Sequence, residues 1–297
     1  MKNLVWEEVA PYGMMSVPKR SRWDLPDLMG EVGEYFDCGA TVGAGDTVFD
    51  VGANVGAFAI EAARRAESDV SLFCFEPVPP IFSALSANAR ENAWLGGART
   101  HLFEKAVVSQ GDPDHTDLAF FRRFPTDSTC DIDEKRRDFE MFFAQKGTAF
   151  RAALTPRVGK TVAAAVGHIV TTMPQGGLGR AVSDLVTGHV RLRAPTTTLS
   201  AVVMERGVTS IDLLKIDVEG AELRVLQGIS DAHWPLIRQI VLEGHDRDGR
   251  LDVIGGMLTE KGFDIAHLTQ PEGADEKGLD SFLLYARRAK TNGNGRA

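Results

Sequence analysis

Short apolar runs alternate with helical patterns along most of this chain. Residues 47–50 and 70–75 are largely apolar, which is typical of strands that are buried on both faces. Between these runs, small apolar side chains recur at helical spacing on one face, at Val55, Ala59, Ala62, Ala63 and Ala66. Strands that alternate with helices predict an α/β fold with a doubly wound, mostly parallel sheet.

The rest of the chain continues this pattern. Further strands are predicted at residues 101–108, 211–216, 239–242, 263–267 and 281–285. Further helices are predicted at residues 79–92, 199–206, 219–227 and 251–261, with Thr198 as an N-cap and Gly207, Gly228 and Gly262 as helix ends. A seven-stranded sheet is therefore expected.

A long insertion at residues 124–194 interrupts the alternation. Its predicted elements are helices at residues 131–154 and 160–170 and a loop at 171–180, flanked by short strands at 118–122 and 190–193. A connection of this length within a compact domain is usually functional or disordered. We interpret it as a helical insertion that caps the substrate pocket, with a surface insertion of no function as the alternative.

A glycine turn follows the first strand of the alternating region, and an acid ends the second. The turn contains Gly52, Asn54 and Gly56, Asp50 precedes it, and Glu76 is the acid. Glycine lets a ligand approach the backbone closely, and an acid in this place can accept hydrogen bonds from both ribose hydroxyls. The arrangement predicts a nucleoside-containing cofactor at the carboxyl ends of the strands.

The chemistry of the turn narrows the choice of cofactor. Neither the dinucleotide fingerprint G-x-G-x-x-G nor a phosphate-binding G-x-x-x-x-G-K-[ST] loop occurs. The carboxylate of Asp50 would repel a pyrophosphate but suits a cationic ligand. S-adenosylmethionine combines adenosine with a cationic methionine and has no phosphate, so it is the preferred cofactor. An ordinary strand–helix–strand unit without a ligand is the alternative.

Three sequence blocks resemble the FkbM family of S-adenosylmethionine-dependent methyltransferases. They are DVGANVG at residues 50–56, FEPVPPIFSALSAN at 75–88 and LLKIDVEGAELRVLQG at 213–228. The resemblance covers roughly residues 40–110 and 195–287, within a methyltransferase domain expected to span residues 41–287. It implies a Rossmann-like class I methyltransferase sheet whose final strand is antiparallel.

The resemblance also implies roles for individual residues. Asp50, Gly52, Asn54 and Gly56 would shape the methionine side of the cofactor pocket. Glu76 would hold the ribose, with Pro77 beside it among the cofactor-binding residues. The main chain of Ala106 and Val107 would lie against the adenine, and Asp217 would border both cofactor and acceptor.

Acids at two adjacent strand ends are the candidates for catalysis. Asp217 or His245 could act as a general base. His245 suits this role because an imidazole ordinarily titrates near neutral pH. Alternatively, Asp217 and Glu243, with His245 or Glu219, could hold Mg²⁺. A third use is structural, in which Glu219 and Glu222 only favour the dipole of the helix that follows.

The acceptor is inferred from the sequence after the fourth strand and from the resemblance. No N-P-P-[YF] motif follows the fourth strand, and FkbM-like proteins are usually associated with O-methylation of sugars, polyketides and peptide-derived metabolites. We therefore expect a hydroxyl on a small molecule, which arrives free or tethered to a carrier protein. N- or C-methylation, a nicotinamide-dependent oxidoreductase and a non-catalytic cofactor-binding scaffold are the alternatives.

Composition limits the partners and the compartment. The 297 residues carry a net charge of −8, which disfavours a nucleic-acid partner. Three separated cysteines indicate neither a disulfide framework nor a zinc site. No signal peptide is recognised, and the longest apolar stretch, at residues 162–170, is too short to span a bilayer. A cytoplasmic protein without a membrane partner is expected.

The two ends of the chain lie outside the pattern. Residues 1–40 form an N-terminal segment whose aromatic and methionine side chains show no clean period. They are Tyr12, Met14, Met15, Trp23, Met29, Tyr35 and Phe36. This segment either covers the mouth of the cofactor site or only packs against the sheet, and packing is the more common role of such residues. Residues 288–297 are polar and are expected to form a disordered tail.

Overall fold

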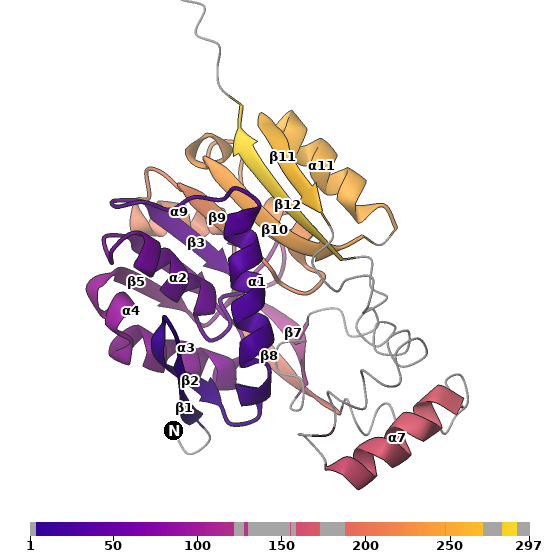
Figure 1. The fold of residues 1–297 in the computed structure, drawn as a ribbon. Coiled ribbons are helices and arrows are strands. Elements are labelled where there is room, and N and C mark those ends of the chain that lie inside the picture. The colour runs from indigo at the N-terminus through magenta and orange to yellow at the C-terminus, as the bar shows by residue number, and fades with distance from the viewer. Residues whose placement is uncertain are drawn as a thin grey trace, which may run out of the picture.

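A central sheet of seven strands organises the structure, which is a computed structural model describing residues 4–121, 128–129, 155, 159–172, 188–246, 248–269 and 281–289 (Figure 1). Across the sheet the strands are β11 (Phe263–Thr269), β12 (Ser281–Arg288), β10 (Gln239–His245), β9 (Leu213–Ile216), β3 (Thr47–Val51), β4 (Ser71–Phe75) and β5 (Arg99–Phe103). The strands from β10 to β5 are parallel, whereas β12 is antiparallel to both of its neighbours. The predicted doubly wound sheet with an antiparallel final strand is confirmed.

Helices cover both faces of the sheet and create two hydrophobic cores. One face packs against α1 (Leu25–Asp37), α2 (Ala57–Arg65), α3 (Pro79–Glu91) and α4 (Ala93–Gly97). The other face packs against α9 (Leu199–Arg206), α10 (Glu222–Gln227) and α11 (Arg250–Glu260). Successive strand residues alternate between the faces, so Val48 lies in the first core and Phe49 in the second. Burial on both faces explains the continuous apolar runs.

The predicted strand at residues 101–108 is wrong as a single element. β5 ends at Phe103, and β6 (Ala106–Val107) leaves the central sheet to pair with β8 (His189–Thr197). The partner of β6 comes from far along the chain, so the local apolar pattern carries no sign of the break. The apolar pattern of this segment therefore shows two separate strands as one.

The edges of the insertion form an antiparallel pair of strands. β7 (His115–Phe121) pairs with β8 over its whole length, which confirms the strands predicted near residues 118–122 and 190–193. The predicted second helix is present as α7 (Lys160–Thr172). In Figure 1, β7 and β8 lie below the central sheet and α7 lies beyond them. The helix predicted at 131–154 and most of the loop predicted at 171–180 lie outside the described residues.

Two asparagines hold the N-terminal segment in place, Asn88 in α3 and Asn92 between α3 and α4. The segment forms a hairpin of β1 (Leu4–Val9) and β2 (Gly13–Pro18), a short 3₁₀ turn (Ser21–Trp23) and α1. Asn88 of α3 donates to the carbonyl oxygen of Ser16 at 2.9 Å and to that of Val55 at 2.7 Å. Asn92 donates to the carbonyl oxygen of Tyr12 at 2.9 Å. These bonds tie the hairpin to the start of α2, and α1 crosses one face of the sheet (Figure 1).

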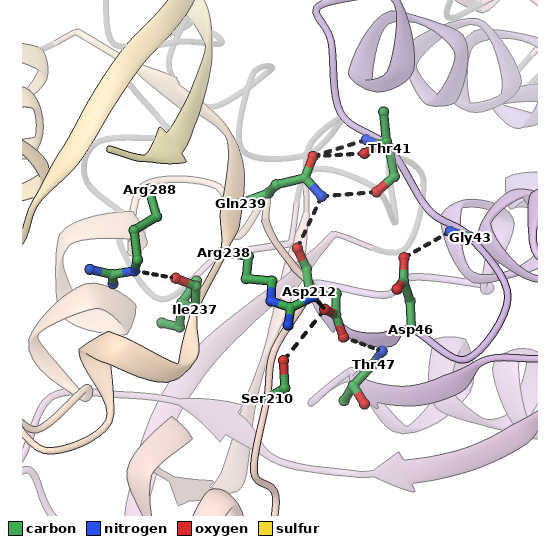
Figure 2. Close-up of polar contacts among 10 residues, drawn as sticks. All are labelled: Thr41, Gly43, Asp46, Thr47, Ser210, Asp212, Ile237, Arg238, Gln239 and Arg288. Carbon is green, nitrogen blue, oxygen red and sulfur yellow. Dashed lines mark hydrogen bonds and ion pairs between the residues drawn. The ribbon is translucent and has the colours of Figure 1, made fainter. Parts of the chain in front are cut away.

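A polar network ties together the amino ends of three parallel strands (Figure 2). The carboxylate of Asp212 accepts the backbone N–H of Thr47 at 2.9 Å and the guanidinium of Arg238 at 2.7 Å. The side-chain amide of Gln239 donates to the carbonyl oxygens of Thr41 and Asp212, both at 3.1 Å. Strands β3, β9 and β10 are thereby held at a common level.

The C-terminal strand extends further than predicted. β12 runs to Arg288, whose guanidinium donates to the carbonyl oxygens of Ile237, Lys261 and Trp234. The predicted tail therefore begins too early, and its residues 290–297 lie outside the described residues. Within the described part of the chain, no helix is long and apolar enough to cross a membrane.

We expect Asp212→Ala to lower the free energy of unfolding by about 1–3 kcal/mol, because the partly buried N–H of Thr47 would lose its acceptor. Arg238→Ala is the control, since its side chain is 68% exposed and an exposed ion pair contributes about 0–1 kcal/mol. Urea unfolding of both variants measures the difference. Equal losses in the two variants would contradict the interpretation of this network.

Candidate active site

The glycine turn connects the carboxyl ends of β3, β4 and β9. The backbone N–H groups of Gly52 and Ala53 donate to the carbonyl oxygen of Phe75 at 3.0 and 2.9 Å. Gly52 has a φ of 80°, and a Cβ atom there would lie 1.7 Å from the carbonyl oxygen of Asp217. Only glycine fits this contact, so the first turn residue and the loop after β9 are held backbone to backbone.

Glu76 lies beside this turn as a buried carboxylate. Its Oε2 atom accepts the backbone N–H of Asn54 at 3.1 Å, and its Oε1 atom accepts that of Val78 at 2.8 Å. Asn54 itself has a φ of 50°, in the left-handed region. Burial raises the pKa of Glu76 to about 7, against the lowering effect of the two backbone hydrogen bonds. Pro77 continues the chain between Glu76 and Val78.

A buried lysine joins the two aspartates of the site. The Nζ atom of Lys215 in β9 lies 3.5 Å from Oδ1 of Asp50 and 3.2 Å from Oδ2 of Asp217, and it donates to the carbonyl oxygen of Gly52 at 2.9 Å. Burial alone would lower the pKa of Lys215, but Asp217 and Asp50 outweigh it and the pKa is raised. Burial raises the pKa of Asp50, and Lys215 opposes this shift. Two carboxylates around one ammonium leave a negative balance beside the turn.

Tyr35 of α1 bridges Asp217, which follows β9, and Glu243, which lies in β10. Its hydroxyl oxygen lies 2.6 Å from Oε2 of Glu243 and 3.2 Å from Oδ2 of Asp217. Burial raises the pKa of Glu243 to about 7 and the negative charge of Asp217 adds to this, while the Tyr35 hydrogen bond opposes it. Burial also raises the pKa of the Tyr35 hydroxyl well above its usual value.

The sequence pattern predicted that Glu243 and His245 follow the end of this strand, but both lie within β10. The parallel pairing with β9 ends at Leu242, but the antiparallel pairing with β12 continues to His245. Both side chains point to the same face of the sheet, because they are two residues apart on one strand. The Nε2 atom of His245 lies 3.5 Å from Oε2 of Glu219. The structure thus brings Glu243 to Asp217 and His245 to Glu219.

The helix predicted at residues 219–227 begins later than expected. Glu219 and Gly220 have φ values of 54° and 101°, so they form a turn, and α10 starts at Glu222. The dipole role predicted for Glu219 is therefore wrong. Glu222 is fully buried, accepts the backbone N–H of Gly220 at 2.7 Å and lies 3.6 Å from Arg250. Burial raises its pKa to about 7.

Ala106 and Val107 follow the end of β5 and are both buried. Their strand, β6, is parallel to β8, opposite Thr196 and Thr197. Their main-chain contact with an adenine ring stays a prediction.

The acid pair does not have the arrangement of a metal site. Asp217 faces the ammonium of Lys215 and the hydroxyl of Tyr35 through the same oxygen atom. An ammonium beside this carboxylate opposes a second cation. Among the residues that the structure describes, no group of three or more histidine, cysteine or acidic side chains could hold a metal ion. The predicted Mg²⁺ alternative therefore does not fit these residues.

Comparison with known proteins identifies the family. Residues 50–265 match the family model described as the methyltransferase FkbM domain. The chain belongs to the FkbM methyltransferase family. It is 35% identical over 259 residues to the 31-O-demethyl-FK506 methyltransferase FkbM of Streptomyces tacrolimicus, a match that covers 86% of this chain and 85% of the relative.

Two further relatives extend the comparison. The methyltransferase sdnD of Sordaria araneosa is 29% identical over 218 residues, which is 73% of each chain. The AMB antimetabolite synthetase AmbE of Pseudomonas aeruginosa is 29% identical over 253 residues, which is 81% of this chain and 10% of that protein. An FkbM-like sequence therefore occurs both as most of a protein and as a small part of a large one.

The residues at the carboxyl ends of the strands fit the S-adenosylmethionine on which this methyltransferase family depends. The turn at Gly52 leaves no room for a Cβ atom, and Glu76 offers a buried carboxylate next to it. The negative balance around Lys215 suits a cationic cofactor. The predicted residues that lie together here are Asp50, Gly52, Asn54, Gly56, Glu76 and Asp217.

Sequence reasoning missed two residues of the site. Lys215 left a signal, because a lysine inside the apolar run of a fully buried strand must have a charged partner. Tyr35 left none, since it is separated from Asp217 by 182 positions and lies in a segment without a clear period.

We expect Gly52→Ala to weaken binding of S-adenosylhomocysteine by about tenfold or more, because displacement of the Asp217 carbonyl would distort both sides of the site. The matched control is Gly45→Ala, which has a similar φ of 86° but no atom within 4 Å of the new Cβ. Both variants carry the cost of a left-handed backbone, about 1–2 kcal/mol. Titration calorimetry measures the affinity, and an unchanged affinity in Gly52→Ala would contradict the predicted pocket.

Proposed function

We propose that this chain transfers the methyl group of S-adenosylmethionine to a hydroxyl of a small-molecule acceptor. The observation that carries the proposal is the position of Asp217. Its carbonyl oxygen packs against Gly52 of the glycine turn, and its carboxylate meets Tyr35, which is hydrogen-bonded to Glu243. An acid next to the cofactor turn can accept the hydroxyl proton while the methyl group transfers in line.

The cofactor side follows from the same geometry. The cofactor supplies a methyl group on a positively charged sulfur. Asp50, Gly52, Asn54 and Gly56 would surround its methionine part, and the carboxylate of Glu76 would accept the ribose hydroxyls. Ala106 and Val107 would border the adenine, and Pro77 would complete the ribose side. The negative balance around Lys215 favours a cationic ligand over a phosphate.

On the acceptor side, Asp217 is the base that we favour. Its carbonyl oxygen packs against Gly52 of the glycine turn, whereas His245 lies 3.5 Å from Glu219. Glu243 would act behind Asp217, through Tyr35. Methyl transfer to a hydroxyl releases one proton, so a carboxylate that is connected to further proton-accepting groups suits this reaction.

The name of one relative supports a hydroxyl acceptor, and the names of two relatives support an acceptor of small-molecule type. One is named for 31-O-demethyl-FK506, and another is a synthetase of an antimetabolite. We propose an acceptor of the same kind, either free or tethered to a carrier protein. A role for the insertion at residues 124–194 as a cap is supported by Thr129, whose hydroxyl donates to the carbonyl oxygen of Glu219 at 2.6 Å. This bond joins the insertion to the loop that carries Asp217.

The role of Glu76 predicts how cofactor affinity depends on pH. Ribose hydroxyls donate to a carboxylate, so binding requires the ionised form, and the pKa of Glu76 is about 7. The affinity for S-adenosylhomocysteine should be constant above that pH and fall by up to about tenfold per pH unit below it, because a proton must then be released. Glu76→Gln should weaken binding and remove this dependence. Glu67→Gln, at an exposed position, is the control, and an unchanged pH profile in Glu76→Gln would refute the role of Glu76.

The reaction is tested with a panel of acceptors that includes 31-O-demethyl-FK506, other compounds with free hydroxyls, and amine analogues of the same compounds. Mass spectrometry should detect the gain of one methyl group on a hydroxyl. Asp217→Asn should lower kcat by about 10²- to 10⁴-fold while S-adenosylhomocysteine still binds. Methylation of the amines alone would overturn the choice of acceptor atom. Full activity of Asp217→Asn would overturn the choice of base.

A further inference from the structure

We infer that Tyr35 joins Asp217 and Glu243 into one proton-sharing unit, so that the proton taken from the acceptor passes through the Tyr35 hydroxyl and ends on Glu243. This inference rests on the proposed function, because Asp217 is the group that receives the proton first. Tyr35 is a positioning and relay residue, and it lies outside residues 50–265, which match the family.

The hydrogen bonds of Tyr35 carry the inference. The tyrosine hydroxyl has one proton to donate. The 2.6 Å contact with Glu243 is that of a short, charge-assisted hydrogen bond. The 3.2 Å contact with Asp217 then has no hydrogen atom of its own while both acids are ionised. A proton that arrives on Asp217 would supply it. Each of the two contacts of Tyr35 then contains one hydrogen atom, the hydroxyl proton in one contact and the additional proton in the other.

The step is balanced without a tyrosinate. The acceptor O–H bond breaks and its proton moves to the Asp217 carboxylate, while the oxygen forms a bond to the methyl carbon and the sulfur keeps the electrons of the broken C–S bond. Asp217 then passes a proton to the hydroxyl oxygen of Tyr35 as Tyr35 releases its own to Glu243. Asp217 returns to the carboxylate, and Glu243 becomes a neutral acid.

The surroundings of the unit suit this direction of transfer. The charged groups that act on Glu243 are Asp217 and Glu219 after β9 and Lys215 within it, Tyr35 faces it from α1, and the residue opposite it on β12 is the apolar Leu283. Glu31 of α1 is a further acid near Tyr35. Burial and Asp217 raise the pKa of Glu243 to about 7, which suits an acid that must accept a proton near neutral pH.

Packing fixes the ring of Tyr35 in this place. The side chain is buried, and its ring meets Phe58 of α2 edge to face, with the ring centroids 5.8 Å apart. Phe36 stacks on the same Phe58 at 5.4 Å, and the ammonium of Lys215 lies 5.6 Å from the centre of the Tyr35 ring. The N-terminal segment thus places one hydroxyl in the site from α1.

An infrared titration tests the unit without any acceptor. The full chain is saturated with S-adenosylhomocysteine, and the band of protonated carboxyl groups is followed with pH. Glu76 and Glu222 also have pKa values of about 7, so the Glu243 component is the difference between each protein and its Glu243→Gln counterpart. This component should have a midpoint near the Glu243 pKa of about 7.

In Tyr35→Phe the midpoint should move to higher pH, because the hydrogen bond that lowers the pKa of Glu243 is removed. Tyr12→Phe, in the hairpin, is the control and should leave the midpoint unchanged. A midpoint that is the same in Tyr35→Phe and in the unsubstituted chain overturns the inference. Circular dichroism and S-adenosylhomocysteine binding verify that each variant is folded.

Kinetics with an acceptor that the protein methylates provide the second measurement. Tyr35→Phe and Glu243→Gln should each lower kcat by about 10²-fold, with KM and cofactor affinity nearly unchanged. The acid limb of the pH profile should also move upward in Tyr35→Phe. Full kcat in Tyr35→Phe overturns the relay even though methylation stands. If no acceptor is methylated, the proposed function fails, and the infrared result still decides whether Tyr35 couples to Glu243.

Discussion

The site depends on the ion pairs that the buried ammonium of Lys215 forms with two aspartates. The ammonium lies between Asp50 and Asp217 and also donates to the carbonyl oxygen of Gly52, so it connects β3, β9 and the glycine turn. Removing one partner of a buried ion pair commonly costs about 3–5 kcal/mol, because the other charge is left without compensation. A lysine in the middle of an apolar strand is therefore a structural requirement for two acids that lie side by side.

The polar groups at the two ends of the parallel strands have different tasks. At the amino ends, Asp212 and Gln239 have their hydrogen-bonding groups satisfied by neighbouring backbone and side chains, which aligns the strands. At the carboxyl ends, burial raises the pKa of Glu76 and Glu243 to about 7. Acids that titrate near neutral pH are typical of sites that bind ligands or move protons. The sheet thus separates groups that stabilise the fold from groups suited to chemistry.

The N-terminal segment links these features to the rest of the molecule. Asn88 holds Ser16 of the hairpin and the carbonyl oxygen of Val55 in the glycine turn, so the hairpin and the turn share one side chain. From the hairpin the chain continues into α1, which brings Tyr35 to Asp217 and Glu243. Residues that showed no regular period therefore pack against the sheet and also reach the acids of the site.

Apolar periodicity and glycine content are local consequences of burial and turn geometry, so they predicted most strands of the central sheet, most helices, the glycine turn and Glu76. The tertiary structure decided the rest. It split residues 101–108 between two sheets, extended β10 to His245 through pairing with β12, and set Glu219 in a turn before α10. It also brought Tyr35 to the acids. Each of these outcomes depends on a partner that is distant along the chain, and only packing of the whole fold selects such partners.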